Sequence, residues 1–108
     1  MAYWHDFSGR LSFDFPDIKA ADYSELCRNM AVAFDLCSVR ELIIGPEQMF
    51  WDFRRGQQII GLDWDIWLGF QVVAKTAGSE PLLRDIVDWL KSTGKIQVQG
   101  TEPEPKGT

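Results

Sequence analysis

Three aspartates and one histidine are the most suggestive candidates for acid–base chemistry in this sequence. Asp63 and Asp65 lie two positions apart, and Asp52 lies one predicted strand earlier. Carboxylates that converge in a cleft can transfer protons or bind a divalent cation. Asp52, Asp63 and His5 are therefore the candidate ligand-binding residues, whereas Asp65 has the position of an aspartate at a turn.

Motifs that would assign a reaction or a cofactor to these residues do not occur in the sequence. It contains no GxSxG or HExxH motif, and its glycines are not spaced as a GxGxxG loop. We therefore predict no cofactor and no metal site, and we expect a protein without enzymatic activity. The alternative is a small enzyme or ligand-binding domain, which requires a pocket in which Asp52, Asp63 and His5 converge.

The two cysteines fall on one predicted helix. Cys27 and Cys37 are ten residues apart. At about 1.5 Å per residue this separates them by about 15 Å, beyond the roughly 7 Å between Cα atoms that a disulfide allows. We predict two buried free thiols, which are usual in a reducing compartment.

The candidate residues must be positioned by the segment 48–75, which reads as an antiparallel meander. Apolar residues alternate with polar ones in three stretches, as in strands with one buried face. The apolar sets are Met49, Trp51 and Phe53, then Ile60, Leu62, Trp64 and Ile66, then Leu68, Phe70, Val72 and Ala74.

The turns of this meander set the strand register. A two-residue turn of Arg55 and Gly56 pairs Trp51 with Ile60 and places both apolar sets on one face. The second turn needs an odd number of residues, and a three-residue turn at 65–67 pairs Trp64 with Leu68. A five-residue turn has the same parity and stays open.

This register also predicts what the opposite face of the sheet carries. Asp52 then faces Ile59, so that Asp52 and Asp63 share this face but lie several residues apart along it. Glycines and polar residues there surround three apolar side chains, which are Phe50, Ile59 and Val73. The face is either an ordinary solvated surface or a partner-binding surface.

Trp67 falls in the predicted second turn, where its side chain would be exposed. Tryptophan is enriched at the energetic centres of protein interfaces. Trp67 is therefore the first candidate for a partner contact, and Trp4 in the aromatic N-terminal segment is a further one. The predicted partner-binding residues are Trp67, Phe50, Ile59, Val73 and Trp4.

The rest of the chain supplies two helices and two further strands. Alternation predicts a strand at 10–15, and Asp22 followed by Glu25 is typical of a capping box that starts a helix reaching Cys37. A strand follows at 39–44, and Ser79 precedes a second helix that ends before Gly94. Residues 95–99 form either a short final strand or an ordered tail, and the aromatic segment 1–9 docks on the domain.

These elements predict a single α+β domain at 1–100 and a disordered tail at 101–108. The order β-α-β-β-β-α, with a final short strand left open, gives a predominantly antiparallel sheet. Because the meander has one strongly apolar face, both helices should cover that face in a two-layer sandwich.

Composition restricts the partners. The 108 residues carry a net charge of −5, without the cationic surface that non-specific nucleic-acid binding needs. No signal peptide or membrane-spanning run is visible, so we expect a cytoplasmic protein without a membrane partner. A protein partner, preferably basic, or a second copy of the chain is the predicted ligand.

The size, the acidity and the predicted helix-over-sheet layout resemble those of small bacterial immunity or antitoxin proteins. The resemblance implies a protein that neutralises a toxin by binding it. It concerns architecture and charge and transfers no site residues.

Overall fold

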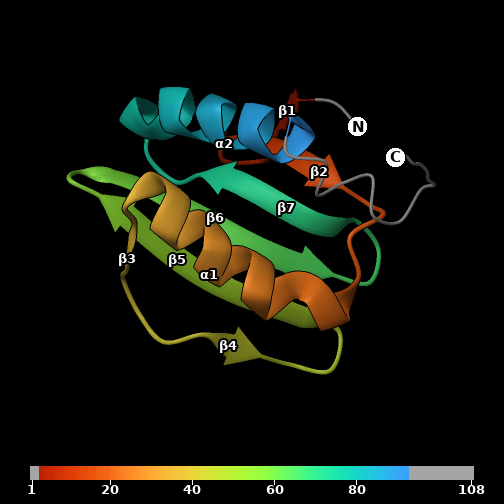
Figure 1. The fold of residues 1–108 in the computed structure, drawn as a ribbon. Coiled ribbons are helices and arrows are strands. Elements are labelled where there is room, and N and C mark those ends of the chain that lie inside the picture. Colours follow the sequence, from red (N-terminus) through yellow and green to blue (C-terminus); the bar gives the residue numbers. More distant parts are fainter. Residues whose placement is uncertain (1–2, 93–108) are drawn as a thin grey trace.

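A computed structural model describes residues 3–92 and shows an α+β fold (Figure 1). The elements are β1 Tyr3–His5, β2 Leu11–Phe15, the 3-10 helix η1 Ala20–Asp22, α1 Tyr23–Phe34, β3 Cys37–Ser38, β4 Ile43–Ile44, β5 Gln48–Arg55, β6 Gln58–Asp65, β7 Gly69–Ala74, the 3-10 helix η2 Ala77–Ser79 and α2 Glu80–Ser92. The predicted class is confirmed. The expected helix end at Gly94, the final strand at 95–99 and the tail at 101–108 lie outside the described residues.

The strands of residues 3–92 form one sheet in the order β1-β2-β7-β6-β5-β3, with β4 also paired to β5. Every pairing is antiparallel. The first predicted strand thus lies beside the last strand of the meander, and the aromatic N-terminal segment adds the edge strand β1. Within residues 3–92 no helix is long and apolar enough to span a bilayer.

One hydrophobic core joins both helices to alternate residues of the strands. Figure 1 shows α1 and α2 lying across the same side of the sheet. Buried residues of the helices form one cluster with the inward residues of β2, β6 and β7; those of the helices are Tyr23, Leu26, Cys27 and Met30 in α1 and Leu82, Leu83, Ile86, Val87 and Leu90 in α2. Burying such side chains contributes roughly 1.5–3 kcal/mol each. We call the other side of the sheet the open face.

The turn between β5 and β6 lies one residue later than predicted. It consists of Gly56 and Gln57 instead of Arg55 and Gly56. Gly56 is its first central residue and has a φ of +61°, which costs glycine little. A one-residue shift of the turn moves the pairing by two residues, so Trp51 pairs with Leu62 instead of Ile60. The apolar sets keep their common face, since side chains alternate with period two.

The turn between β6 and β7 has the predicted odd length, but it too lies one residue later. It spans Ile66–Leu68, and Trp64 pairs with Phe70 instead of Leu68. The predicted turn at 65–67 is therefore wrong by one position.

Close backbone packing fixes where β7 begins. Gly69 has a φ of +75°, and an ideal Cβ on it would lie 2.6 Å from the Cα of Pro16 and 2.7 Å from the carbonyl oxygen of Phe15. Only glycine fits both the backbone conformation and the space. The end of β2 therefore presses against the start of β7.

Helix α1 begins at Tyr23, as the position of Asp22 predicts, although Asp22 forms no side-chain capping hydrogen bond. The helix ends earlier than predicted, because Asp35 takes the left-handed conformation, with a φ of +56°. Cys37 consequently lies on β3 and is exposed, which corrects the prediction of a buried thiol in the helix. Cys27 is buried and free, as predicted.

The predicted strand at 39–44 is replaced by the two short strands β3 and β4. Both pair with β5, and the N–H of Val39 adds one bond to the carbonyl of Asp52. Figure 1 shows β4 at the outer edge of the sheet. Short edge strands leave few backbone groups in register for an unwanted neighbour.

Candidate functional site

Asp52 and Asp63 lie closer together than the sequence analysis predicts. Asp52 pairs with Gly61 instead of Ile59, and Asp63 is two residues from Gly61 on the same face of β6. An ideal Cβ on Gly61 would be 3.3 Å from Asp52 Oδ1 and 3.5 Å from Asp63 Oδ1. The two carboxylates therefore flank a glycine whose missing side chain leaves space between them.

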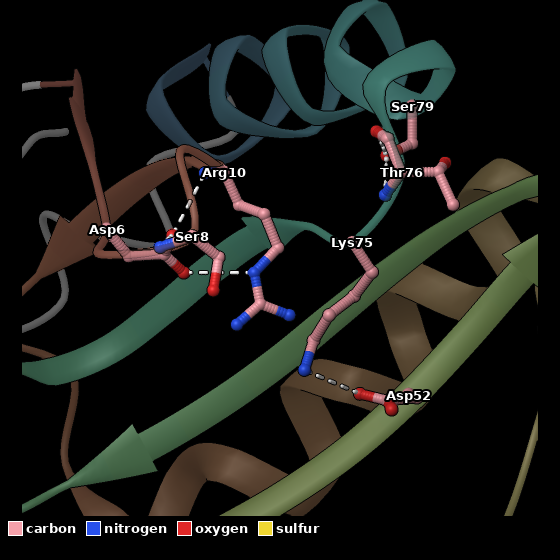
Figure 2. A network of polar contacts seen from close by, with 7 residues as sticks. All are labelled: Asp6, Ser8, Arg10, Asp52, Lys75, Thr76 and Ser79. Carbon is pink, nitrogen blue, oxygen red and sulfur yellow. Dashed lines mark hydrogen bonds and ion pairs between the residues drawn. The ribbon is translucent and has the colours of Figure 1, made fainter.

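Lys75 lies in that space. Its Cε is 2.5 Å from the ideal Cβ position of Gly61, so its methylene chain crosses the glycine. Its ammonium nitrogen is 3.7 Å from Asp52 Oδ1. Figure 2 marks this ion pair with a dashed line. Arg40 approaches the other oxygen of Asp52, with Nε 3.8 Å from Oδ2. Both cationic side chains thus form their ion pairs with Asp52.

Asp63 is the buried member of the pair. It is 8% exposed, and its Oδ1 has no hydrogen-bond partner in residues 3–92. Burial is the main cause that raises the pKa of Asp63. The charges of Lys75 and Arg10 oppose the rise and that of Asp52 adds to it, with a net pKa of about 7. Near neutral pH this carboxyl therefore exchanges between its neutral and charged forms.

His5 does not join the two aspartates. It pairs with Leu11, a core residue, so alternation along β1 and β2 directs it to the helix-covered side of the sheet. Asp63 lies on the open face. The expected cluster of Asp52, Asp63 and His5 is therefore not formed, and no group of three or more His, Cys, Asp or Glu side chains in the described part of the chain could hold a metal ion.

The turn after β6 presents three large apolar side chains. Ile66, Trp67 and Leu68 are 51%, 66% and 37% exposed. The carboxylate of Asp65 accepts hydrogen bonds from the backbone N–H groups of Trp67 and Leu68, at 2.9 and 2.7 Å, and its other oxygen accepts one from Gln71. The backbone of this turn is thus held while its side chains face water.

Phe50 and Ile43 extend this apolar surface along the open face. They pair across β5 and β4, and both are exposed. The N–H of Ile66 donates to the carbonyl of Glu47, which joins the β4–β5 turn to the β6–β7 turn. We call the surface formed by Ile43, Phe50, Ile66, Trp67 and Leu68 the apolar end.

The five predicted partner-binding residues therefore separate into groups. Trp67 and Phe50 belong to the apolar end. Trp4 is exposed on β1, where its indole N–H donates to Asp14, and Ile59 is half-buried beside the other turn of the meander. Val73 is buried, which corrects its predicted exposure, because all six residues of the central strand β7 are covered.

Three members of the apolar end were not predicted as contacts. The sequence pattern predicts Ile43 within a longer strand, and it predicts Ile66 and Leu68 on the inward stripes of β6 and β7. The run Ile66-Trp67-Leu68 directly after an aspartate was the signal that could have identified them, since turns are usually built from polar residues and glycine.

Charge differs between the two ends of the meander. Glu47 and Asp65 lie at the apolar end, whereas Arg54 and Arg55 adjoin the Gly56 turn at the opposite end of β5. Burial raises the pKa of the neighbouring carboxyl of Asp14, against the hydrogen bond from Trp4. The apolar surface is thus bordered by acidic groups.

Comparisons with protein-family models, curated proteins and solved structures found no match to this chain.

Proposed function

We propose that the chain is a protein-binding module without enzymatic activity, and that it docks a basic protein through the apolar end. The observation that carries the proposal is the exposure of Trp67, at 66%, in a turn whose backbone is already held. Buried tryptophans dominate the energetics of many interfaces, and an ordered surface loses little conformational entropy on binding.

Charge favours a basic protein over a second copy of the chain. Glu47 and Asp65 border the apolar end, and a symmetric dimer would place these groups near their own copies. Juxtaposed like charges weaken an interface, whereas a basic partner would be attracted and guided to the surface. Neutralisation of a basic toxin, the type implied by the resemblance to immunity proteins, is one case of this proposal.

The first test is the molar mass in solution, measured by light scattering over a range of concentrations. We expect a monomer for the wild type and for Trp67→Ala. A dimer that Trp67→Ala dissociates would make a second copy the occupant and contradict the proposed basic partner.

The second test is photo-crosslinking from position 67 in the native host, followed by purification of the captured protein and measurement of its Kd. Trp67→Ala should weaken binding by at least about 30-fold, and added salt should weaken it further. Phe7→Ala is the matched control, because Phe7 is an exposed aromatic residue in another turn. Equal affinities of Trp67→Ala and wild type would place the interface elsewhere.

A further inference from the structure

Three cationic side chains near Asp63 form their ion pairs with other carboxylates. Lys75 and Arg40 approach Asp52, at 3.7 and 3.8 Å. Arg10 Nε lies 3.0 Å from Asp6 Oδ2, an ion pair that Figure 2 shows beside Lys75. Asp63 feels the charges of Lys75 and Arg10 but forms no ion pair with a cation of residues 3–92.

Neighbouring carboxylates are also supplied with hydrogen-bond donors. Asp65 accepts bonds from two backbone N–H groups and from Gln71, and Asp14 accepts one from the indole of Trp4. Asp63 Oδ1 has no such donor in residues 3–92, although the side chain is more than nine-tenths buried. A buried acceptor without a partner destabilises the folded state, and a charged one destabilises it more.

The surroundings of this oxygen suit a cation. Asp63 pairs with Phe50, whose exposed ring belongs to the apolar end, and Gly61 leaves space on the other side. Only the methylene chain of Lys75 crosses that space, and its ammonium group points to Asp52. An aromatic ring beside a carboxylate can contact both the apolar stem and the charged head of a lysine or arginine.

We propose that Asp63 is the anchor for a lysine or arginine side chain of the bound protein, which enters over Phe50 from the apolar end. The inference rests on the proposed function and names the chemistry of the partner's central residue. The incoming cation displaces the Lys75 methylenes from above Gly61 and leaves the Lys75 ammonium on Asp52. A charge-assisted hydrogen bond to Asp63 then satisfies the buried oxygen.

The charged and titratable groups near Asp63 come from several elements. They are Asp52 on β5, Asp65 on β6, Lys75 after β7, Arg10 before β2, and Tyr23 and Cys27 on α1. Burial raises the pKa of both Tyr23 and Cys27, so these two stay neutral near pH 7. The other four groups are two acids and two bases, whose charges cancel in number. The net charge that a ligand cation meets therefore depends on whether Asp63 is ionised.

The test uses a phage-displayed library of random dodecapeptides selected on the full chain. We expect the enriched peptides to carry a lysine or arginine beside aromatic or aliphatic residues. A synthetic peptide from the selection should bind Asp63→Asn about 30-fold more weakly than wild type. Replacing its basic residue with norleucine should weaken wild-type binding similarly and leave Asp63→Asn binding unchanged within about threefold.

Controls separate this inference from the proposed function. Asp85→Asn makes the same change in net charge on the exposed face of α2 and should leave the affinity unchanged. Two results would overturn this inference and leave the proposed function standing. The first is a set of peptides that need Trp67 but contain no basic residue, and the second is peptides that bind Asp63→Asn as tightly as wild type. Failure to enrich any peptide that depends on Trp67 would contradict both proposals.

The pH dependence of the same peptide affinity provides an independent readout. A cation binds the ionised carboxylate, so binding should tighten about tenfold between pH 6 and pH 8, as expected for a pKa of about 7, and this dependence should vanish in Asp63→Asn. Binding that weakens over this range would show that the neutral acid is the binding form and would overturn the proposed cation.

Discussion

The two turns of the central meander differ in what holds them and in what they expose. The turn at Gly56 adjoins Arg54 and Arg55, and a Cβ on Gly56 would meet no atom within 4 Å. The turn at 66–68 exposes three apolar side chains, is held by Asp65, and is followed by a glycine packed against the backbone of β2. The second turn thus combines a hydrogen-bonded, closely packed backbone with exposed apolar side chains.

The largest expected difference between the turns is in the substitution of their glycines. Gly69→Ala should lower the free energy of unfolding by at least about 3 kcal/mol, because its Cβ would meet the backbone of β2 and its φ is positive. Gly56→Ala should lower it by only about 1 kcal/mol, the conformational penalty alone. Urea unfolding of both variants checks this contrast, and equal losses would contradict it.

Asp63→Asn should stabilise the protein at pH 8 by about 2 kcal/mol. Because burial raises the pKa of Asp63 from its usual value of 3.8 to about 7, the folded state holds this proton more tightly than the unfolded state. The contribution of Asp63 to stability therefore falls as the pH rises from about 4 to about 7. The stability difference between Asp63→Asn and wild type should grow over that range and then level off, as measured by urea unfolding in a pH series. A constant difference would contradict the raised pKa.

Asp65→Ala should cost about 1–2 kcal/mol, since three hydrogen bonds to its carboxylate are lost. The amide protons of Trp67 and Leu68 should exchange faster with solvent in this variant. Gln57→Ala in the other turn should change stability by less than about 0.5 kcal/mol. Unchanged exchange rates at positions 67 and 68 would show that Asp65 does not hold the turn.

Trp67→Ala should have the smallest effect on folding, within about 0.5 kcal/mol, because the side chain lies mainly in water. Trp64→Ala is the contrast: Trp64 packs against the core and donates its indole N–H to the carbonyl of Ile18, so its loss should cost about 3 kcal/mol or more. Thermal unfolding of the two variants measures the difference. A large loss for Trp67→Ala would mean that this residue serves the fold.

Periodicity was sufficient for the sheet faces but not for the register. Alternation placed Trp51, Leu62 and Phe70 correctly toward the core, and parity gave the odd length of the second turn. Both turns were nevertheless placed one residue early, because a shift of two in pairing preserves the faces and leaves no trace in the pattern. The early end of α1 depended on the left-handed conformation of Asp35, an uncommon state for a residue other than glycine.

The candidate site was less predictable for a related reason. Within residues 3–92, the lack of an ion pair to Asp63 depends on which carboxylate each nearby cation approaches, and Lys75, Arg40 and Arg10 come from distant parts of the sequence. No spacing along the chain contains that information. The exposure of Trp67 in a turn, by contrast, could be predicted from the sequence, since a tryptophan in a turn conflicts with the usual polar composition.

The hydrogen bonds from Asp65 reach the backbone of the 66–68 turn and not its side chains. Any residue except proline can supply the N–H groups that Asp65 binds at positions 67 and 68. The tip can therefore diversify on an unchanged backbone. Under the proposed function, evolution or a designer could change the choice of partner by replacing these three side chains, without rebuilding the domain that displays them.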